Sequence, residues 1–246
     1  MASNLNRLRI CAEHSNTEPQ QDFRTASDDG RVEAYFKDLE THLVGHIRHA
    51  DYVVGCVAWL TSKPILAALA TIKGASLVIQ KEDWLRPDAD CGQGWKSNLR
   101  SMYGALPAAL SRYDLGLRGT VLRMMSAGGD PTIEAVRCVG AHNRDRRPAF
   151  PRSHHKFVVF CRHVGDPPPL DEEEAGWHWP DYKPYAVWTG SFNFTQNATH
   201  SFENAVLLRH PEIVTAYFRE YAQVAALSEP LDWDDDWCCP EWRIGT

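Results

Sequence analysis

Two short segments of the chain combine residue types that can act on a phosphate group. One reads SHHKFVVF and contains His154 and Lys156, and the other reads TGSFNFT and contains Ser191 and Asn193. If the first segment is a strand, His154 and Lys156 point to one face and His155 points to the opposite face. A histidine beside a lysine can supply a nucleophile and a positive charge at a phosphate. This pair therefore predicts a reaction at phosphorus.

The second segment supplies hydrogen-bond donors. In an extended chain Ser191 and Asn193 share a face, both can donate a hydrogen bond, and Gly190 allows close approach of the backbone. Either segment alone has an ordinary explanation, because an H-x-K triplet occurs by chance and G-S-x-N is common in turns. The two segments each adjoin an apolar strand and occur in this order, and that combination is much more specific.

The order H-x-K, then G-S-x-N, then FENA from Phe202 resembles the signature of the phospholipase D superfamily, in its nuclease-like branch that carries a single motif. The resemblance covers roughly residues 31–80 and 133–226. Cys161 stands where the family pattern H-x-K-x₄-D has its aspartate. The fold that the resemblance implies is α/β, with a mixed β-sheet flanked by helices in a two-fold symmetric homodimer.

The resemblance also implies a role for each motif residue. His154 would be the nucleophile that forms a phosphohistidine intermediate, and Lys156 and Asn193 would bind the non-bridging phosphate oxygens. Ser191 would add a hydrogen bond near the phosphate or the histidine. Glu203 would accept the second ring N–H of a catalytic histidine and fix its tautomer. No metal ion and no other cofactor would be required.

This chemistry needs a second proton-handling group, because one group attacks phosphorus and another protonates the leaving oxygen. The resembling family uses two histidines, but the chain has no second H-x-K. The nearest triplet, His142-x-Arg144, has no second G-S-x-N. The simplest solution is a homodimer in which His154 of each subunit meets its copy at the two-fold axis.

Basic residues precede the first motif, and we expect them to contact the phosphate backbone of a substrate: Arg144, Arg146, Arg147 and Arg152. The alternative is a solvated basic loop. The net charge of −6 argues against a nucleic-acid binder, but two acidic stretches carry much of it, and basic residues are in excess elsewhere. Further candidates are Lys81, Trp84 and Arg86 for the mouth of the site. Trp177, Trp179 and Trp188 are candidates for stacking on bases, although packing in a core or an interface is the expected role of most of them.

Helices and strands alternate around the motifs. Apolar residues recur at mostly three- and four-residue spacing and predict an amphipathic helix through Val32, Tyr35, Phe36, Leu39, Leu43 and Ile47. Residues 50–60 predict a buried strand, 65–72 a helix capped by Ser62, and 75–80 a second buried strand. Further strands are expected at 133–140, 154–160, 186–189 and 205–209, and helices at 99–110 and 213–227. The βαβ unit favours a parallel or mixed sheet covered by helices.

This organisation predicts three parts. Residues 1–30 form a polar N-terminal extension with a short strand at residues 5–10. Residues 31–227 form the catalytic domain, with a Pro-rich and acidic surface loop inserted at 165–184. Residues 228–246 form an acidic, Trp-rich tail that we expect to dock on the domain or on a protein partner rather than on nucleic acid.

The expected function is that of a metal-independent phosphodiesterase, a hydrolase that acts as a nuclease, and more narrowly as an endonuclease, on DNA or RNA. The alternatives are a phospholipid or small-molecule phosphodiesterase and a non-catalytic scaffold with the same fold. No apolar run reaches ~18 residues, so no membrane span is expected. Seven cysteines without a visible export signal predict reduced thiols in the cytoplasm.

Overall fold

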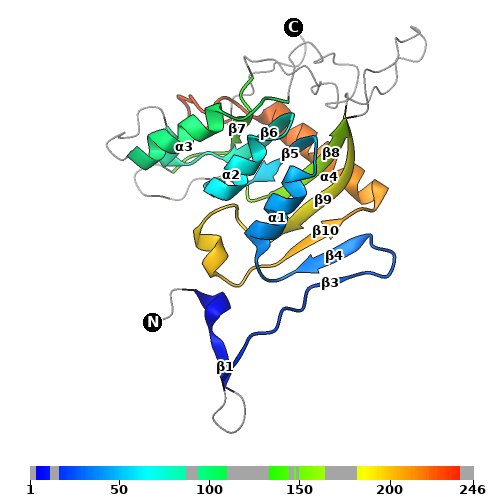
Figure 1. The fold of residues 1–246 in the computed structure, drawn as a ribbon. Coiled ribbons are helices and arrows are strands. Elements are labelled where there is room, and N and C mark those ends of the chain that lie inside the picture. Colours follow the sequence, from blue (N-terminus) through cyan, green and yellow to red (C-terminus); the bar gives the residue numbers. More distant parts are fainter. Residues whose placement is uncertain are drawn as a thin grey trace, which may run out of the picture.

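The computed structural model describes residues 4–11, 17–86, 94–109, 133–143, 147, 150–163 and 182–238. Its centre is an eight-stranded sheet with the strand order β3-β4-β10-β9-β8-β5-β6-β7 (Figure 1). The strands are β3 (Thr25–Ala26), β4 (Val32–Tyr35), β5 (Tyr52–Val57), β6 (Gly74–Gln80), β7 (Val136–Val139), β8 (Lys156–His163), β9 (Tyr182–Gly190) and β10 (Ala205–Leu208). Because β5, β6 and β7 are parallel and the other neighbours are antiparallel, the sheet is mixed, which confirms the prediction.

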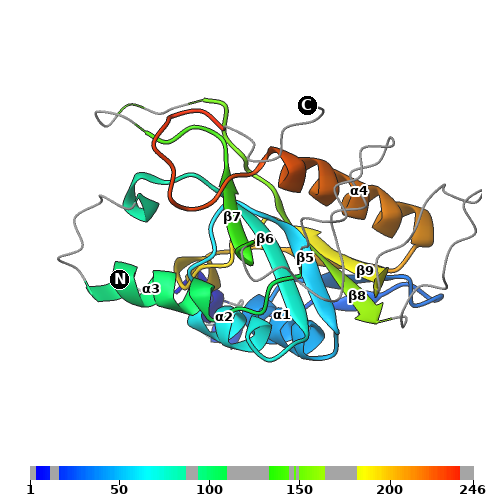
Figure 2. The ribbon, with the colours of Figure 1, turned by 90° about the horizontal axis from the view of Figure 1, so that it is seen from above.

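Helices cover both faces of this sheet, which is also confirmed. α1 (Leu39–Arg48), α2 (Lys63–Leu69) and α3 (Gly94–Gly104) lie on one face, and α4 (Pro211–Leu227) lies on the other (Figure 2). α2 begins at the predicted cap, because the Ser62 hydroxyl accepts a hydrogen bond from the Ile65 amide at 3.2 Å. α3 lies earlier in the chain than the helix expected over residues 99–110.

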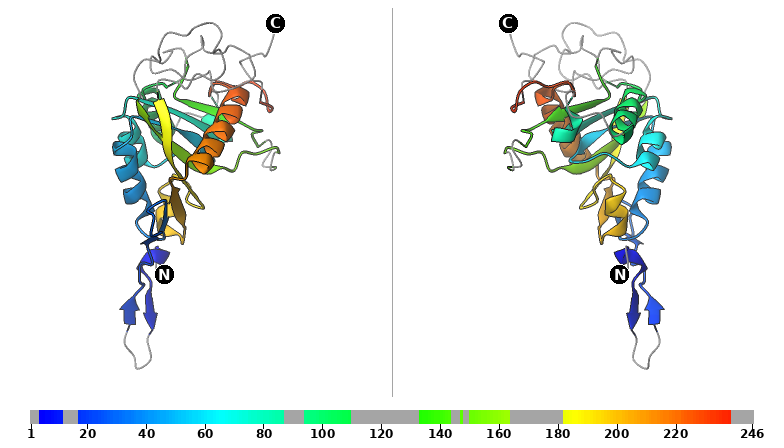
Figure 3. Two further views of the ribbon diagram at one scale, coloured as in Figure 1. Left: turned by 90° about the vertical axis from the view of Figure 1, so that its right-hand side faces the viewer. Right: turned by 90° about the vertical axis from the view of Figure 1, so that its left-hand side faces the viewer.

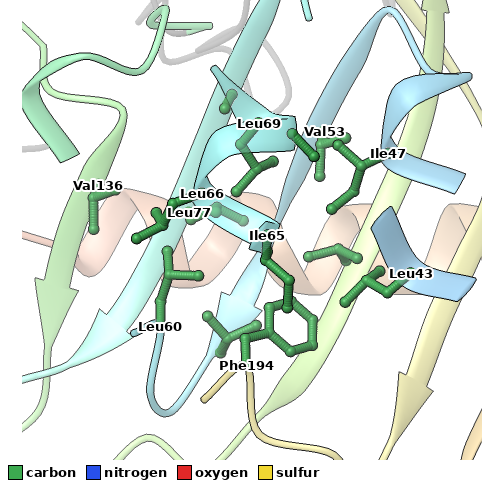
Figure 4. Packing of buried hydrophobic residues seen from close by; sticks show 14 of the residues in the cluster. Leu43, Ile47, Val53, Leu60, Ile65, Leu66, Leu69, Leu77, Val136 and Phe194 are labelled. Carbon is green, nitrogen blue, oxygen red and sulfur yellow. The ribbon is translucent and has the colours of Figure 1, made fainter. Parts of the chain in front are cut away.

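The two faces of β8 belong to two apolar cores. Val158 and Phe160 pack into the core under α1 and α2, whereas Phe157, Val159 and Cys161 pack into the core under α4. Figure 4 shows the first core, in which side chains of α1 and α2 meet side chains of β5, β6 and β7. The Cys161 thiol is fully buried, and burial raises its pKa well above the ordinary value. The position that holds aspartate in the family pattern is therefore an apolar core position in this chain.

The helix predicted from Val32 onward is wrong in its first half. Val32–Tyr35 is strand β4, which pairs antiparallel with β10, and the helix begins only at Leu39. The chain changes direction at Asp38, whose φ of 50° lies in the left-handed region. β10 offers backbone hydrogen-bond partners that lie far away in the sequence, and this pairing overrides the local spacing of apolar residues.

The N-terminal extension contributes to two separate sheets. After a short 3-10 helix, η1 (Leu5–Arg7), strands β1 (Arg9–Cys11) and β2 (Thr17–Pro19) form an antiparallel hairpin. Figure 3 shows that this hairpin projects away from the body of the molecule. Only the end of the strand expected at residues 5–10 is extended. β3 then adds the edge strand of the large sheet beside β4.

The acidic segment 228–238 is folded against the sheet. The backbone of Glu229 pairs with Cys138 of β7 through two hydrogen bonds of 2.9 Å. The Glu229 carboxylate forms an ion pair with the fully buried Lys81, whose ammonium group also donates to the Trp237 carbonyl oxygen at 2.9 Å. This segment therefore docks on the domain, one of the two outcomes expected for the tail.

Several expectations fall on residues that lie outside the described ranges. They concern most of the insertion at 165–184 with Trp177 and Trp179, and residues 239–246 of the tail. Trp188 is described and is buried, and its ring lies 4.9 Å from the Tyr35 ring, so it packs in the core, the role expected for most of these tryptophans. Among the described residues, no helix is long and apolar enough to cross a membrane.

Candidate active site

The start of β8 places the first motif. Lys156 pairs with Val57 of β5, and the Ala58 amide donates to the His155 carbonyl oxygen at 2.8 Å. His154 is exposed, and the Lys156 Nζ atom lies 3.1 Å from both its Nδ1 atom and its carbonyl oxygen. The two side chains therefore lie together, as the alternation of strand side chains predicts.

His155 belongs to the opposite face of the sheet. Its ring lies 5.5 Å from the Phe157 ring, and its Nε2 atom lies 3.5 Å from a carboxylate oxygen of Glu220 on α4. This arrangement separates His155 from the side of the sheet on which His154 and Lys156 meet.

The loop after β9 directs Asn193 out of the core. Its neighbours Phe192 and Phe194 are both buried. The Phe194 carbonyl oxygen accepts hydrogen bonds of 2.8 Å from the amides of Thr61 and Ser62. Figure 4 shows the Phe194 ring packed in the core under α1 and α2. Asn193 lies between these two anchors and lines a pocket together with Glu203.

Gly190 is required by the close approach of two backbones. A Cβ atom at this position would lie 2.2 Å from the Asn204 carbonyl oxygen. The Ser191 amide donates to the same oxygen at 3.0 Å, and the Asn204 amide donates to Ser191 Oγ at 3.0 Å. The Ser191 hydroxyl in turn donates a short hydrogen bond to the Glu203 carboxylate. The second motif and the FENA segment thus form one unit.

The surroundings of His154 favour its neutral form. Although the side chain is exposed, partial desolvation lowers the pKa of His154 from its ordinary value of 6.5, and the positive charges of Lys156 and Arg152 lower it further. Burial also lowers the pKa of Lys156, and the Glu203 carboxylate opposes that effect. Glu203 therefore acts electrostatically on the same lysine that contacts His154, which brings all five predicted motif residues into one neighbourhood.

The structure describes two of the four predicted phosphate-contacting arginines. Arg152 donates to Asn143 Oδ1 at 3.1 Å and lies 3.5 Å from a carboxylate oxygen of Glu82. The Nε atom of Arg152 is buried and has no hydrogen-bond partner. Arg147 is exposed. Arg144 and Arg146 lie outside the described residues.

Sequence reasoning missed Trp59 and Glu82. The pairing of β5 with β8 places Trp59 opposite His154, and their rings lie 5.9 Å apart with an edge-on angle of 88°. The Trp59 indole N–H donates to Glu82 Oε1 at 2.8 Å. The only available signal was the position of Trp59 at the end of a predicted strand, which does not reveal its partner strand.

Of the three residues expected to line the mouth of the site, one lies there in the structure. Trp84 lines the pocket that contains Asn193 and Glu203. Lys81 does not, because it is fully buried and paired with Glu229. Arg86 caps the short 3-10 helix η2 (Asp83–Leu85) through its backbone amide. In the described part of the chain, no group of three or more histidine, cysteine, aspartate or glutamate side chains is arranged to hold a metal ion.

Comparisons with known proteins give distant likenesses. No family model matches the sequence. An uncharacterized protein of Acanthamoeba polyphaga mimivirus is 28% identical over 240 residues, which cover 94% of this chain and 74% of that protein.

Three solved structures show a distant structural likeness to this chain. Nuc from Salmonella typhimurium, described as a phospholipase D family member, is 16% identical over 80% of this chain and 95% of its own, with a TM-score of 0.42. NucT from Helicobacter pylori is 11% identical over 78% and 93%, with a TM-score of 0.46. A phosphatidylserine synthase from Haemophilus influenzae is 10% identical over 89% and 43%, with a TM-score of 0.39. All three TM-scores lie below 0.5, so the function proposed next rests on the residues of this chain.

Proposed function

We propose that this protein is a metal-independent phosphodiesterase, and specifically a nuclease that cleaves DNA or RNA within the chain through a phosphohistidine intermediate. The observation that carries this proposal is the contact of His154 with Lys156 beside the unit of Ser191, Asn193 and Glu203. A histidine whose pKa is lowered keeps a free ring nitrogen near neutral pH, as a nucleophile requires.

The proposed reaction has two steps, and the second step restores both His154 and the general acid. In the first, a ring nitrogen of His154 forms a bond to phosphorus, the bond from phosphorus to the leaving oxygen breaks, and a general acid protonates that oxygen. In the second, water attacks phosphorus, the phosphorus–nitrogen bond breaks, and the proton of the water passes to the group that acted as acid. Lys156 and Asn193 stabilise the charge on the non-bridging oxygens in both steps.

The polar neighbours have positioning roles in this proposal. Glu203 holds the Ser191 hydroxyl in this chain, and among the described residues no hydrogen bond joins Glu203 to His154. We assign Glu203 to orient a catalytic histidine once the second subunit is present. Arg152, with a buried Nε–H that lacks a partner, contacts a substrate phosphate together with Arg144, Arg146 and Arg147.

The proposed enzyme is a homodimer. In the described ranges no second histidine is hydrogen-bonded to the motif residues. His142, the nearest alternative by sequence, is buried, and its Nε2 atom lies 2.9 Å from an Asp236 carboxylate oxygen. A two-fold axis at His154 supplies the missing general acid from the second copy.

Mixing chains tests the shared site. Wild-type protein is refolded with an increasing share of the His154→Ala variant, and the rate of cleavage is measured. Mixed dimers lose either the nucleophile or the general acid, so activity is expected to fall towards the square of the wild-type fraction. A linear decline, or full activity of a protein that is monomeric under assay conditions, contradicts the dimer.

The titration of His154 is a second test. We expect NMR titration of its ring protons to give a pKa below 6.5, because burial and two neighbouring positive charges disfavour the protonated ring. In the Lys156→Gln variant one of those charges is absent, so the pKa is expected to rise. A wild-type pKa of 6.5 or more, or no rise in the variant, contradicts the electrostatic account of the nucleophile.

A cleavage assay in EDTA separates the proposal from its alternatives. Purified protein is incubated with single- and double-stranded DNA and RNA and, separately, with phospholipid vesicles. Cleavage of nucleic acid in EDTA supports the nuclease, release of a lipid headgroup supports a phospholipid phosphodiesterase, and no product supports a scaffold.

The buried thiols of Cys56, Cys138 and Cys161 form no disulfide bonds, which fits the proposed cytoplasmic location.

A further inference from the structure

Three tryptophans line a pocket beside the motif residues. Trp59, Trp84 and Trp95 come from the loop after β5, from η2 and from the first turn of α3, and the pocket has a volume of about 550 Å³. The rings of Trp84 and Trp95 lie 5.5 Å apart at an angle of 45°, so neither covers the face of the other completely. Trp95 is 47% exposed. Trp84 also packs against the core under α1 and α2, so Trp95 presents the most exposed aromatic surface of the three at this opening.

The pocket is continuous with the candidate active site. Asn193 and Glu203 belong to its lining, and the ring centroids of Trp59 and His154 lie 5.9 Å apart with the two rings nearly perpendicular. The Trp59 ring is held in place, because its N–H donates to Glu82, a carboxylate that is itself buried. A molecule that stacks in the pocket therefore has its neighbouring groups close to the nucleophile.

Apart from Ala198, the rest of the lining is polar. Hydroxyl and amide groups make up this side of the pocket: Thr61, Thr195, Gln196, Asn197 and Ser201. The Asn193 Oδ1 atom is buried and has no hydrogen-bond partner. Such groups both donate and accept hydrogen bonds, as the edge of a nucleobase does. An acyl chain would satisfy none of them, and burial of an unsatisfied polar group costs free energy.

We propose that this pocket binds one unpaired nucleobase next to the scissile phosphate, so that the substrate is single-stranded nucleic acid. This inference rests on the proposed function and deepens it. Aromatic side chains bind the flat faces of bases irrespective of sequence, whereas bases in a duplex are already stacked on both faces and paired at their edges. The polar lining then adds contacts to the free edge of the base.

Binding measurements with a catalytically inactive chain test the proposal without cleavage. The His154→Ala protein is titrated against a labelled short single strand, the same strand with abasic positions, and the matching duplex, and fluorescence anisotropy is read. Adding Trp95→Ala is expected to weaken single-strand binding about tenfold to a hundredfold. Trp95→Phe keeps an aromatic face and is expected to retain most of the affinity. Trp237→Ala, which removes an exposed tryptophan outside the pocket, is the matched control and is expected to change nothing.

The strand with abasic positions gives the decisive comparison. Its binding is expected to be weak in the parent protein and insensitive to Trp95→Ala, because the group that stacks is missing. Equal losses for the single strand and the duplex, no loss with Trp95→Ala, or a loss confined to binding of phosphatidylglycerol vesicles overturns the proposal. If Trp95→Ala weakens binding but the active protein cleaves no phosphodiester, the proposed function fails and the base pocket stands. If the protein cleaves nucleic acid and Trp95→Ala changes neither binding nor cleavage, the base pocket fails and the proposed function stands.

Discussion

Replacement of His154 with alanine is expected to abolish phosphodiester cleavage while the protein stays folded. The side chain is exposed, so its loss is expected to change the free energy of unfolding by no more than about 0.5 kcal/mol. Loss of the attacking group removes the first chemical step, and kcat/KM is expected to fall by ~10⁴-fold or more. The measurements are the rate of cleavage in EDTA and urea unfolding of both proteins.

His155→Ala is the matched control for this prediction. The two histidines are adjacent and both exposed, but His155 faces α4 and forms its ion pair with the partly exposed Glu220. An exposed ion pair contributes little to stability, so this variant is expected to keep both activity and fold. Loss of cleavage in a folded His155→Ala protein, with activity kept in His154→Ala, would show that the register of β8 in the working enzyme is different.

The largest effect on stability is expected from the buried ion pair of Lys81 and Glu229. Lys81 is fully buried and Glu229 is 6% exposed, so removal of one partner leaves the other charge without compensation in the interior. Glu229→Ala is expected to lower the free energy of unfolding by about 3–5 kcal/mol. Urea unfolding measures the change. An effect below about 1 kcal/mol would indicate that the C-terminal segment leaves the sheet at little cost.

A double variant separates the charge from the packing. When Lys81→Met is combined with Glu229→Ala, no unpaired charge stays in the interior. The double variant is therefore expected to have a higher free energy of unfolding than the Glu229→Ala variant. Asp232→Ala is a suitable comparison, because it removes the acid of an ion pair with Arg100 on the same C-terminal segment, and Asp232 is exposed. The loss from that partly exposed pair is expected to be about 1 kcal/mol or less.

Local features of the sequence were sufficient to predict the contact between His154 and Lys156. The alternation of side chains in a strand depends only on neighbouring residues, and the apolar run after Lys156 marks the strand clearly. The Ser62 cap was predictable for the same reason, since the cap and the first turn of its helix are adjacent in the chain.

The tryptophan pocket was not predictable in this way. Trp59 lies beside His154 because β5 pairs with β8. Trp95 lies beside Trp84 because of the way α3 packs in the folded chain. Partners that are distant in the sequence decide these contacts, and no local period reports them. The strand at Val32–Tyr35 was missed for the same physical reason, since its partner β10 lies near the other end of the chain.

The two edges of the large sheet have a consequence for self-association. One edge is β3, which has only two residues, and at the other edge Glu229 occupies the backbone groups of Cys138 in β7. Short or covered edges discourage the joining of sheets from separate molecules, the first step of ordered aggregation. Extension of the sheet is therefore a poor route for two copies to meet. The dimer proposed above, with its contact at the loops around His154, would leave both edges of the sheet outside the interface.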